Sequence, residues 1–120
     1  MDKAFLCPTT TQEEKEIIIS NRFKNEDGAS AAFKVRSMTQ EEVDVLIKQA
    51  IRHTKNGDVF DGQDFNRRLI VAATVMPDFR AKELCDAYGV LDPLMVPGKM
   101  LLAGEFNKLL GAILDLSGME

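Results

Sequence analysis

Residues 38–57 constrain the fold most, because the start and the middle of this segment both follow the pattern of one amphipathic helix. Apolar side chains recur at the spacing of a single helical face, at Val43, Leu46, Ile47, Ala50 and Ile51. Thr39 and Glu42 are spaced for a capping box, in which each side chain accepts a hydrogen bond from the other residue's backbone N–H. Met38 is placed to pack against Val43, so the helix is predicted to start at Thr39.

The end of this helix is predicted from charge and turn chemistry. Cations favour the negative end of a helix dipole, and the segment offers Arg52, His53 and Lys55 there. Asn56 and Gly57 follow, and both residue types adopt the left-handed backbone that ends many helices. We therefore predict that the helix continues as far as Asn56 and Gly57.

Composition predicts one domain and argues against nucleic acid as a partner. A chain of 120 residues with 45% hydrophobic content closes a single core but is short for two domains. Its 15 Lys and Arg against 19 Asp and Glu give a net charge of −4, whereas nucleic-acid binders usually carry a basic face. No run reaches the ~18 apolar residues of a membrane span, and residues 1–8 are too short in apolar sequence for a signal peptide. We expect no membrane association and a cytoplasmic location.

The domain is predicted to span residues 15–118, after a flexible arm at 1–14 that offers little to bury. Its first part, 15–37, is predicted to be a β-hairpin: residues 15–23 concentrate β-branched side chains, and 32–37 alternate apolar with polar ones. Asp27–Gly28 supplies turn chemistry between the two strands. A lone hairpin is unstable in water, so its edge is a candidate for pairing with another copy of the chain, giving a homo-oligomer.

The helical part is predicted at 39–118, and residues 65–76 are its ambiguous segment. The β-branched content of 65–76 would suit a buried strand, yet its length and its apolar face, before Pro77, favour a helix. Asp61 or Asp64 is placed to cap such a helix. We favour the helix and leave the strand open.

Three further helices are predicted toward the C-terminus. Asp78 is placed to cap a short helix at 81–88, closed by Gly89 with Val90 in Schellman position. A second should open at Asp92–Pro93, and Pro97–Gly98 should break or kink it. The last, 105–116, should stop at Gly118 and carries one apolar stripe of Phe106, Leu109, Leu110, Ile113 and Leu114. The predicted fold class is α+β, mainly α, with an N-terminal antiparallel β-hairpin followed by a compact bundle of about four to five helices.

The residues with chemical potential do not assemble into a predicted catalytic, cofactor or metal site. His53 is the only histidine and is interpreted as complementing a helix dipole. Cys7 and Cys85 are unaccompanied in sequence and are predicted to be free thiols, with Cys85 a buried apolar side chain rather than a nucleophile. The carboxylates near Gly62 miss the spacing of a calcium loop, and turn and helix capping explain Asp58, Asp61 and Asp64.

Arg67 and Arg68 are the charged residues with a predicted binding role. A pair of arginines at the start of a helix is most often a solvated face. With Lys48 and Arg52 they can instead form a basic patch for an acidic partner.

Several segments, taken in order, resemble the XkdN-like phage tail assembly chaperones. The resemblance covers about Lys15 to Gly118 and is carried by Phe33–Glu42, Phe65–Phe79, Glu83–Val90, Leu101–Leu110 and Leu116–Gly118. It implies a non-catalytic protein of the bacterial host cytoplasm that binds the tape measure protein and keeps it soluble during tail tube assembly, with the tail tube protein as a second partner. The family offers no catalytic motif to transfer. The alternative is a structural tail or baseplate component present in the finished particle.

An apolar helical surface is expected to bind the tape measure protein. Only one of the two amphipathic stripes, at 43–51 and 106–114, needs to be fully satisfied inside the domain. The predicted contact residues are Arg67, Arg68, Phe106, Leu109, Leu110 and Ile113.

Overall fold

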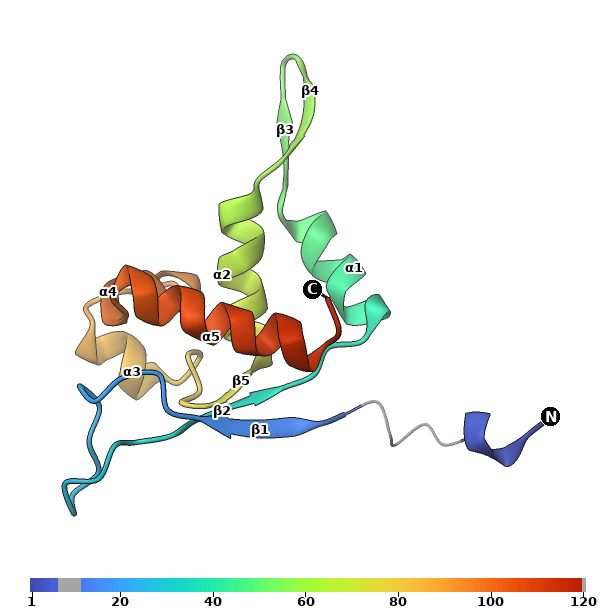
Figure 1. Cartoon of the computed structure of the whole chain (residues 1–120). Helices are drawn as coiled ribbons and strands as arrows, with labels where there is room; N and C mark the ends of the chain where they lie inside the picture. The colour runs from blue at the N-terminus through green and yellow to red at the C-terminus, as the bar shows by residue number, and fades with distance from the viewer. Residues whose placement is uncertain (7–11, 120) are drawn as a thin grey trace.

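The computed structural model describes residues 1–6 and 12–119 and has the predicted α+β class (Figure 1). Its helices are η1 (Lys3–Phe5), α1 (Gln40–Gln49), α2 (Gly62–Ala73), α3 (Lys82–Ala87), η3 (Pro93–Met95), α4 (Val96–Met100) and α5 (Ala103–Leu116). Its strands are β1 (Glu14–Ile17), β2 (Phe33–Arg36), β3 (Ile51–Thr54), β4 (Gly57–Phe60) and β5 (Thr74–Met76). The predicted arm at 1–14 and the predicted thiol of Cys7 both involve residues 7–11, which lie outside the described residues.

The predicted hairpin is present as the antiparallel pair β1 and β2, with Ile17 opposite Phe33. The first strand ends at Ile17 rather than Phe23, because the chain then leaves the sheet as a long connection that packs Ile19 into the core and carries Arg22 to α5. β2 is the central strand of a sheet ordered β1-β2-β5. Phe33 and Val35, the apolar members of the predicted alternation at 32–37, face the core with exposed fractions of 2% and 0%.

The start of α1 follows the predicted capping box. The Glu42 amide donates to Thr39 Oγ1 at 3.2 Å, and the Thr39 amide donates to Glu42 Oε1 at 3.0 Å. Met38 and Val43 are both buried in the core. The Arg36 guanidinium, and after it the Thr39 amide, hold the pKa of Glu42 below its ordinary value. The lowered pKa favours the charged form of the Glu42 carboxylate, and the ion pair of Glu42 with Arg36 links the end of β2 to α1.

The predicted end of this helix is wrong. α1 stops at Gln49, and residues 51–60 form the hairpin of β3 and β4, which projects away from the helices (Figure 1). Ile51 lies opposite Phe60 in this hairpin, and its tight turn uses Gly57 at φ 111°. Glycine with positive φ is common both at helix ends and in hairpin turns. Gly57 was predicted to end a helix, and in the structure it forms part of a hairpin turn instead.

The ambiguous segment 65–76 is helix in its longer part and strand at its end. Of the two predicted caps it is Asp61 that caps α2, accepting from the amides of Gln63 and Asp64, both at 3.1 Å. After Ala73 the chain becomes extended, and β5 pairs antiparallel with β2, placing Thr74 opposite Val35. The β-branched residues at the end of the segment thus complete the sheet, because β2 offers a free edge beside them.

The C-terminal helices agree with the predictions in part, and α5 ends at Leu116 as predicted but starts at Ala103 rather than at residue 105. α3 ends in the predicted Schellman motif, with the Val90 amide donating to the Cys85 carbonyl at 3.0 Å and Gly89 at φ 68°. Its N-cap is Ala81, however, because Asp78 instead accepts from the Arg80 amide. Of the predicted break or kink at 97–98, the break is wrong, because Pro97 lies in the first turn of α4, where a proline disrupts no helical hydrogen bond.

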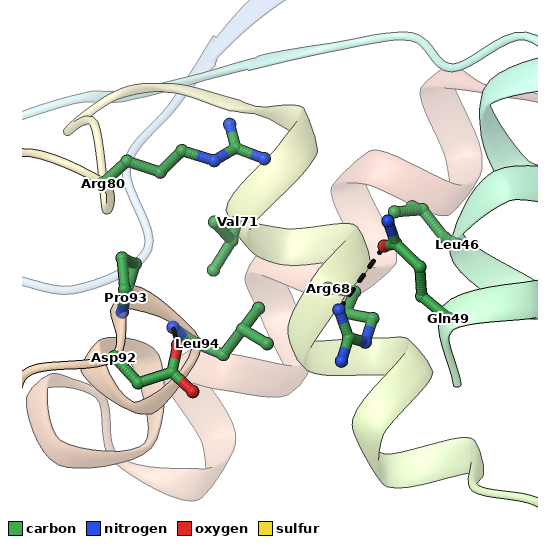
Figure 2. A pocket seen from close by; sticks show the side chains of 8 residues that line it. All are labelled: Leu46, Gln49, Arg68, Val71, Arg80, Asp92, Pro93 and Leu94. Carbon is green, nitrogen blue, oxygen red and sulfur yellow. Dashed lines mark hydrogen bonds between the residues drawn. The ribbon is translucent and has the colours of Figure 1, made fainter. Parts of the chain in front are cut away.

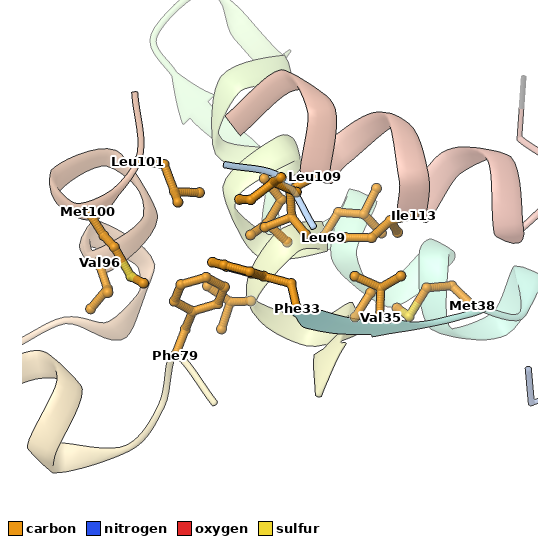
Figure 3. Packing of buried hydrophobic residues seen from close by; sticks show 14 of the residues in the cluster. Phe33, Val35, Met38, Leu69, Phe79, Val96, Met100, Leu101, Leu109 and Ile113 are labelled. Atoms are coloured by element: carbon orange, nitrogen blue, oxygen red, sulfur yellow. The ribbon is translucent and has the colours of Figure 1, made fainter. Parts of the chain in front are cut away.

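The core lies between β2, α2 and α5 (Figure 3). Its fully buried side chains, each 0% exposed, include Val35, Leu69, Ile70, Phe79, Val96, Leu109 and Ile113. Burial of such side chains contributes roughly 1.5–3 kcal/mol each, so this cluster is the main source of stability. Among residues 1–6 and 12–119, none of the helices combines the length and apolar character that a membrane span requires.

One ion pair ties the long β1–β2 connection to the start of α5. Arg22 donates to both carboxylate oxygens of Glu105, at 3.0 and 2.6 Å, and also to the Met100 carbonyl at 2.9 Å. The Glu105 carboxylate also accepts from the Leu102 amide at 2.8 Å. Hydrogen bonds from Arg22, then Ser20, then Leu102 lower the pKa of Glu105 to about 2.

Candidate functional site

Two of the six predicted contact residues lie in the core. Leu109 and Ile113 are 0% exposed, so the apolar stripe of α5 packs on the domain itself. Phe106 and Leu110 lie at the border of this stripe and are half-buried. An amphipathic face looks the same in sequence whether it covers a core or a partner, and here the core takes most of it.

Arg67 and Phe106 meet at one hollow on the surface. They line a cavity of about 310 Å³ between α2, α4 and α5, together with Gln63, Asn66, Gly98 and Asn107. The Arg67 guanidinium lies 3.8 Å from the Asp64 carboxylate. Gln63, Asn66 and Asn107 give this cavity side-chain amides that can hydrogen-bond to a partner, beside the apolar ring of Phe106.

Arg68 lines a different cavity, which we call the α1–α2–η3 pocket and which has a volume of about 250 Å³ (Figure 2). Its lining residues are Leu46, Gln49, Arg68, Val71, Arg80, Asp92, Pro93 and Leu94. Arg68 donates to Asp64 at 2.6 Å and to Gln49 at 3.4 Å. The predicted basic patch is therefore divided, because neighbouring Arg67 and Arg68 face separate cavities and share one carboxylate.

A third cavity, missed from the sequence, runs between β5 and α3. This β5–α3 groove has a volume of about 430 Å³ and is lined by Met76, Pro77, Asp78, Ala81, Glu83, Leu84 and Ala87. Met76 is 59% exposed, a large fraction for an apolar side chain in a strand. The signal that points to it is the Thr74-Val75-Met76 run before Pro77, once that run is assigned to an edge strand.

The residues considered for chemistry are separated from these cavities. His53 lies on the projecting hairpin, where its Nδ1 is 2.7 Å from Asp58 Oδ1 and its side chain is 82% exposed. Cys85 is a buried free thiol in α3, with Sγ 3.6 Å from the Phe79 carbonyl. In the part of the chain that the structure describes, no three His, Cys, Asp or Glu side chains are grouped to hold a metal ion.

Comparison with known proteins gives one consistent result. The family model for the phage XkdN-like tail assembly chaperone protein matches residues 3–120. The chain is 34% identical over 127 aligned residues to the uncharacterized protein YqbN of Bacillus subtilis (strain 168), covering 99% of this chain and 85% of that relative. It is also 34% identical over 127 aligned residues to the phage-like element PBSX protein XkdN of the same strain, covering 99% and 86%.

A solved structure shares the fold. The crystal structure of the protein YqbN aligns with a TM-score of 0.84 at 32% identity, over 100% of this chain and 98% of that one. Similarity of sequence and similarity of backbone thus extend over the same whole length.

Proposed function

This chain belongs to the family of XkdN-like phage tail assembly chaperones, and from that premise we propose that it binds its tape measure protein and keeps it soluble while the tail tube assembles. The match of the family over residues 3–120 carries the proposal. The chain acts without catalysis in the host cytoplasm, and the tail tube protein displaces it as the tube polymerises. Only reversible contact is required of it, and the three cavities described above offer sites for such contact.

The β5–α3 groove supports an apolar contact with a helical client. Met76, Pro77 and Leu84 give it an apolar lining, and the methionine side chain is flexible enough to adapt to different client residues. Asp78 and Glu83 border the same groove, and such charges keep a free chaperone from associating with itself. A helix that lays its apolar face into a groove of this kind is a common mode of peptide recognition.

Co-expression with the tape measure protein tests the proposal. The tape measure protein should move from the insoluble to the soluble fraction when this chain is present, and the two should elute together. Met76→Glu should reduce that rescue, because it places a carboxylate in the groove. The matched control is Leu91→Glu, since Leu91 is 101% exposed and lines none of the three cavities. A tape measure protein that is equally soluble alone, with no complex recovered, contradicts the proposed function.

The second candidate is a structural tail component, and the projecting hairpin is the observation that favours it. Val59 and Phe60 of β4 are 46% and 51% exposed, and β4 belongs to the hairpin that projects away from the helices. A permanent contact in a tail would bury such residues. The composition of finished particles separates the two candidates.

A further inference from the structure

The α1–α2–η3 pocket combines an apolar wall with cationic groups (Figure 2). Leu46 of α1 and Val71 of α2 supply apolar lining and are 9% and 2% exposed, and Leu94 of η3 points toward α2. The volume of about 250 Å³ is below the roughly 300–1,000 Å³ of small-molecule sites. The pocket is thus sized for side chains of a partner rather than for a cofactor.

The arginines of this pocket differ in how they are paired. Arg68 is held by Asp64 through its Nε, at 2.6 Å, which fixes its direction and leaves other guanidinium N–H groups for an acceptor. The backbone N–H of Arg80 donates to Asp78 at 3.0 Å. Its guanidinium makes no hydrogen bond or ion pair with any residue in 1–6 and 12–119, although it extends toward α2 above Val71.

The carboxylate in the pocket does not neutralise these groups. Asp92 accepts from the Leu94 amide at 3.0 Å, where it caps η3, and it makes no ion pair within 1–6 and 12–119. A ligand anion is therefore favoured on the Arg80 and Arg68 side and disfavoured near Asp92. The whole chain has a net charge of −4, so the Arg80 guanidinium gives this pocket a positive charge that differs in sign from the net charge of the protein.

We propose that this pocket takes an apolar side chain together with a neighbouring carboxylate, both from one helix of the tape measure protein. The proposal rests on the proposed function and names the chemistry that this pocket selects. An Asp or Glu three or four residues from a Leu, Met or Phe lies on the same helical face. The apolar side chain then contacts Leu46, Val71 and Leu94, while the carboxylate accepts from Arg80 and from the free N–H groups of Arg68. This pocket gives specificity, whereas the β5–α3 groove gives general apolar contact.

Affinity measurements with Arg80→Gln test the proposal. The dissociation constant of the purified chain for its tape measure protein is measured at low and moderate salt. Arg80→Gln should weaken binding about tenfold at low salt, as expected for a lost charge-assisted hydrogen bond, and should flatten the salt dependence. Circular dichroism should show an unchanged fold, because the Arg80 guanidinium has no partner among the described residues. The control is Lys55→Gln, an exposed lysine between β3 and β4, which should change affinity less than about twofold.

The outcomes separate this proposal from the proposed function. If the unaltered chain binds and Arg80→Gln binds equally well, the pocket assignment is overturned and the chaperone function stands. If the unaltered chain does not bind at all, the chaperone function fails and takes the pocket assignment with it. Charge reversal adds a second test: one Glu→Arg or Asp→Arg change in the tape measure protein should restore binding to Arg80→Glu. If no such reversal restores it, the carboxylate contact is refuted.

Discussion

Leu109→Ala should destabilise the domain strongly, because Leu109 lies in the core rather than on a binding surface. Leu109 is 0% exposed and shares its cluster with Leu69, Ile113 and Phe33, which are 0%, 0% and 2% exposed. Because these neighbouring side chains are already tightly packed, they cannot move far enough to fill the cavity that removal of the leucine side chain creates. The expected loss is therefore about 3–4 kcal/mol of unfolding free energy, within the ~2.7–5.0 kcal/mol measured for buried Leu→Ala changes. Domains of this size have only ~5–15 kcal/mol in total.

Urea denaturation followed by circular dichroism measures this loss. With a denaturant slope of about 1.5–2 kcal/mol per molar, the midpoint should fall by about 2 M. Leu102→Ala is the matched control, because Leu102 directly precedes α5 and is 61% exposed. It should lower the unfolding free energy by less than about 0.5 kcal/mol.

Two results would refute the reasoning. A Leu109→Ala protein that unfolds within 0.5 M of the unaltered chain, roughly 1 kcal/mol, would mean that the α5 stripe is not part of the core. Equal effects of Leu109→Ala and Leu102→Ala would mean the same. Either result would return Leu109 to the set of residues available for partner contact.

Three further predictions concern the cap, the ion pair and the absence of chemistry. Thr39→Ala should lower the unfolding free energy by about 1 kcal/mol because it removes the acceptor for the Glu42 amide, and an unchanged urea midpoint would contradict the capping box. Because the pKa of Glu105 is lowered from 4.5 to about 2, the Arg22 pair should stabilise the fold fully above pH 4.5 and lose that effect as pH falls toward 2. Glu105→Gln should lack this part of the acid dependence of the urea midpoint, so equal acid profiles would argue against the pair. His53→Ala should support tail assembly as well as the unaltered chain does, because His53 is 82% exposed and Asp58 of the same hairpin is its ion-pair partner among the described residues; failure of assembly by a folded variant would reopen a catalytic interpretation.

The predictions that the structure confirms depend on neighbouring residues. The Thr39 and Glu42 box and the Asp61 cap each need only a carboxylate or hydroxyl within three positions of an amide. The Schellman motif at Gly89 is equally local. Such signals are complete within one helical turn, so the sequence is sufficient to locate these helix ends.

The wrong predictions required knowledge of the other strands. The apolar period that predicts α1 continues through Ala50 and Ile51, yet the pairing of Ile51 with Phe60 turns the chain into β3. Likewise, the end of 65–76 becomes β5 only because the edge of β2 is free to pair with Thr74. A strand depends on its partner, whereas helical periodicity is read from one segment alone.

The candidate cavities were predicted only in part. Three residues predicted from the sequence to contact a partner do line cavities: Arg67 and Phe106 share one, and Arg68 lines another. Arg80 was not among them, because its position beside Val71 depends on how the β5–α3 loop packs across α2. Burial of Leu109 could not be inferred either, since periodicity does not tell which apolar face the domain covers.

The composition of finished particles tests the chaperone account most directly. Particles made by the phage or prophage that encodes this chain are purified through high-salt washes, and their proteins are quantified by mass spectrometry against the tape measure protein. The chaperone account predicts that this chain is abundant in the assembling lysate, bound to the tape measure protein, and absent from the particles. A fixed, stoichiometric number of copies in washed particles would contradict that account and establish a structural component.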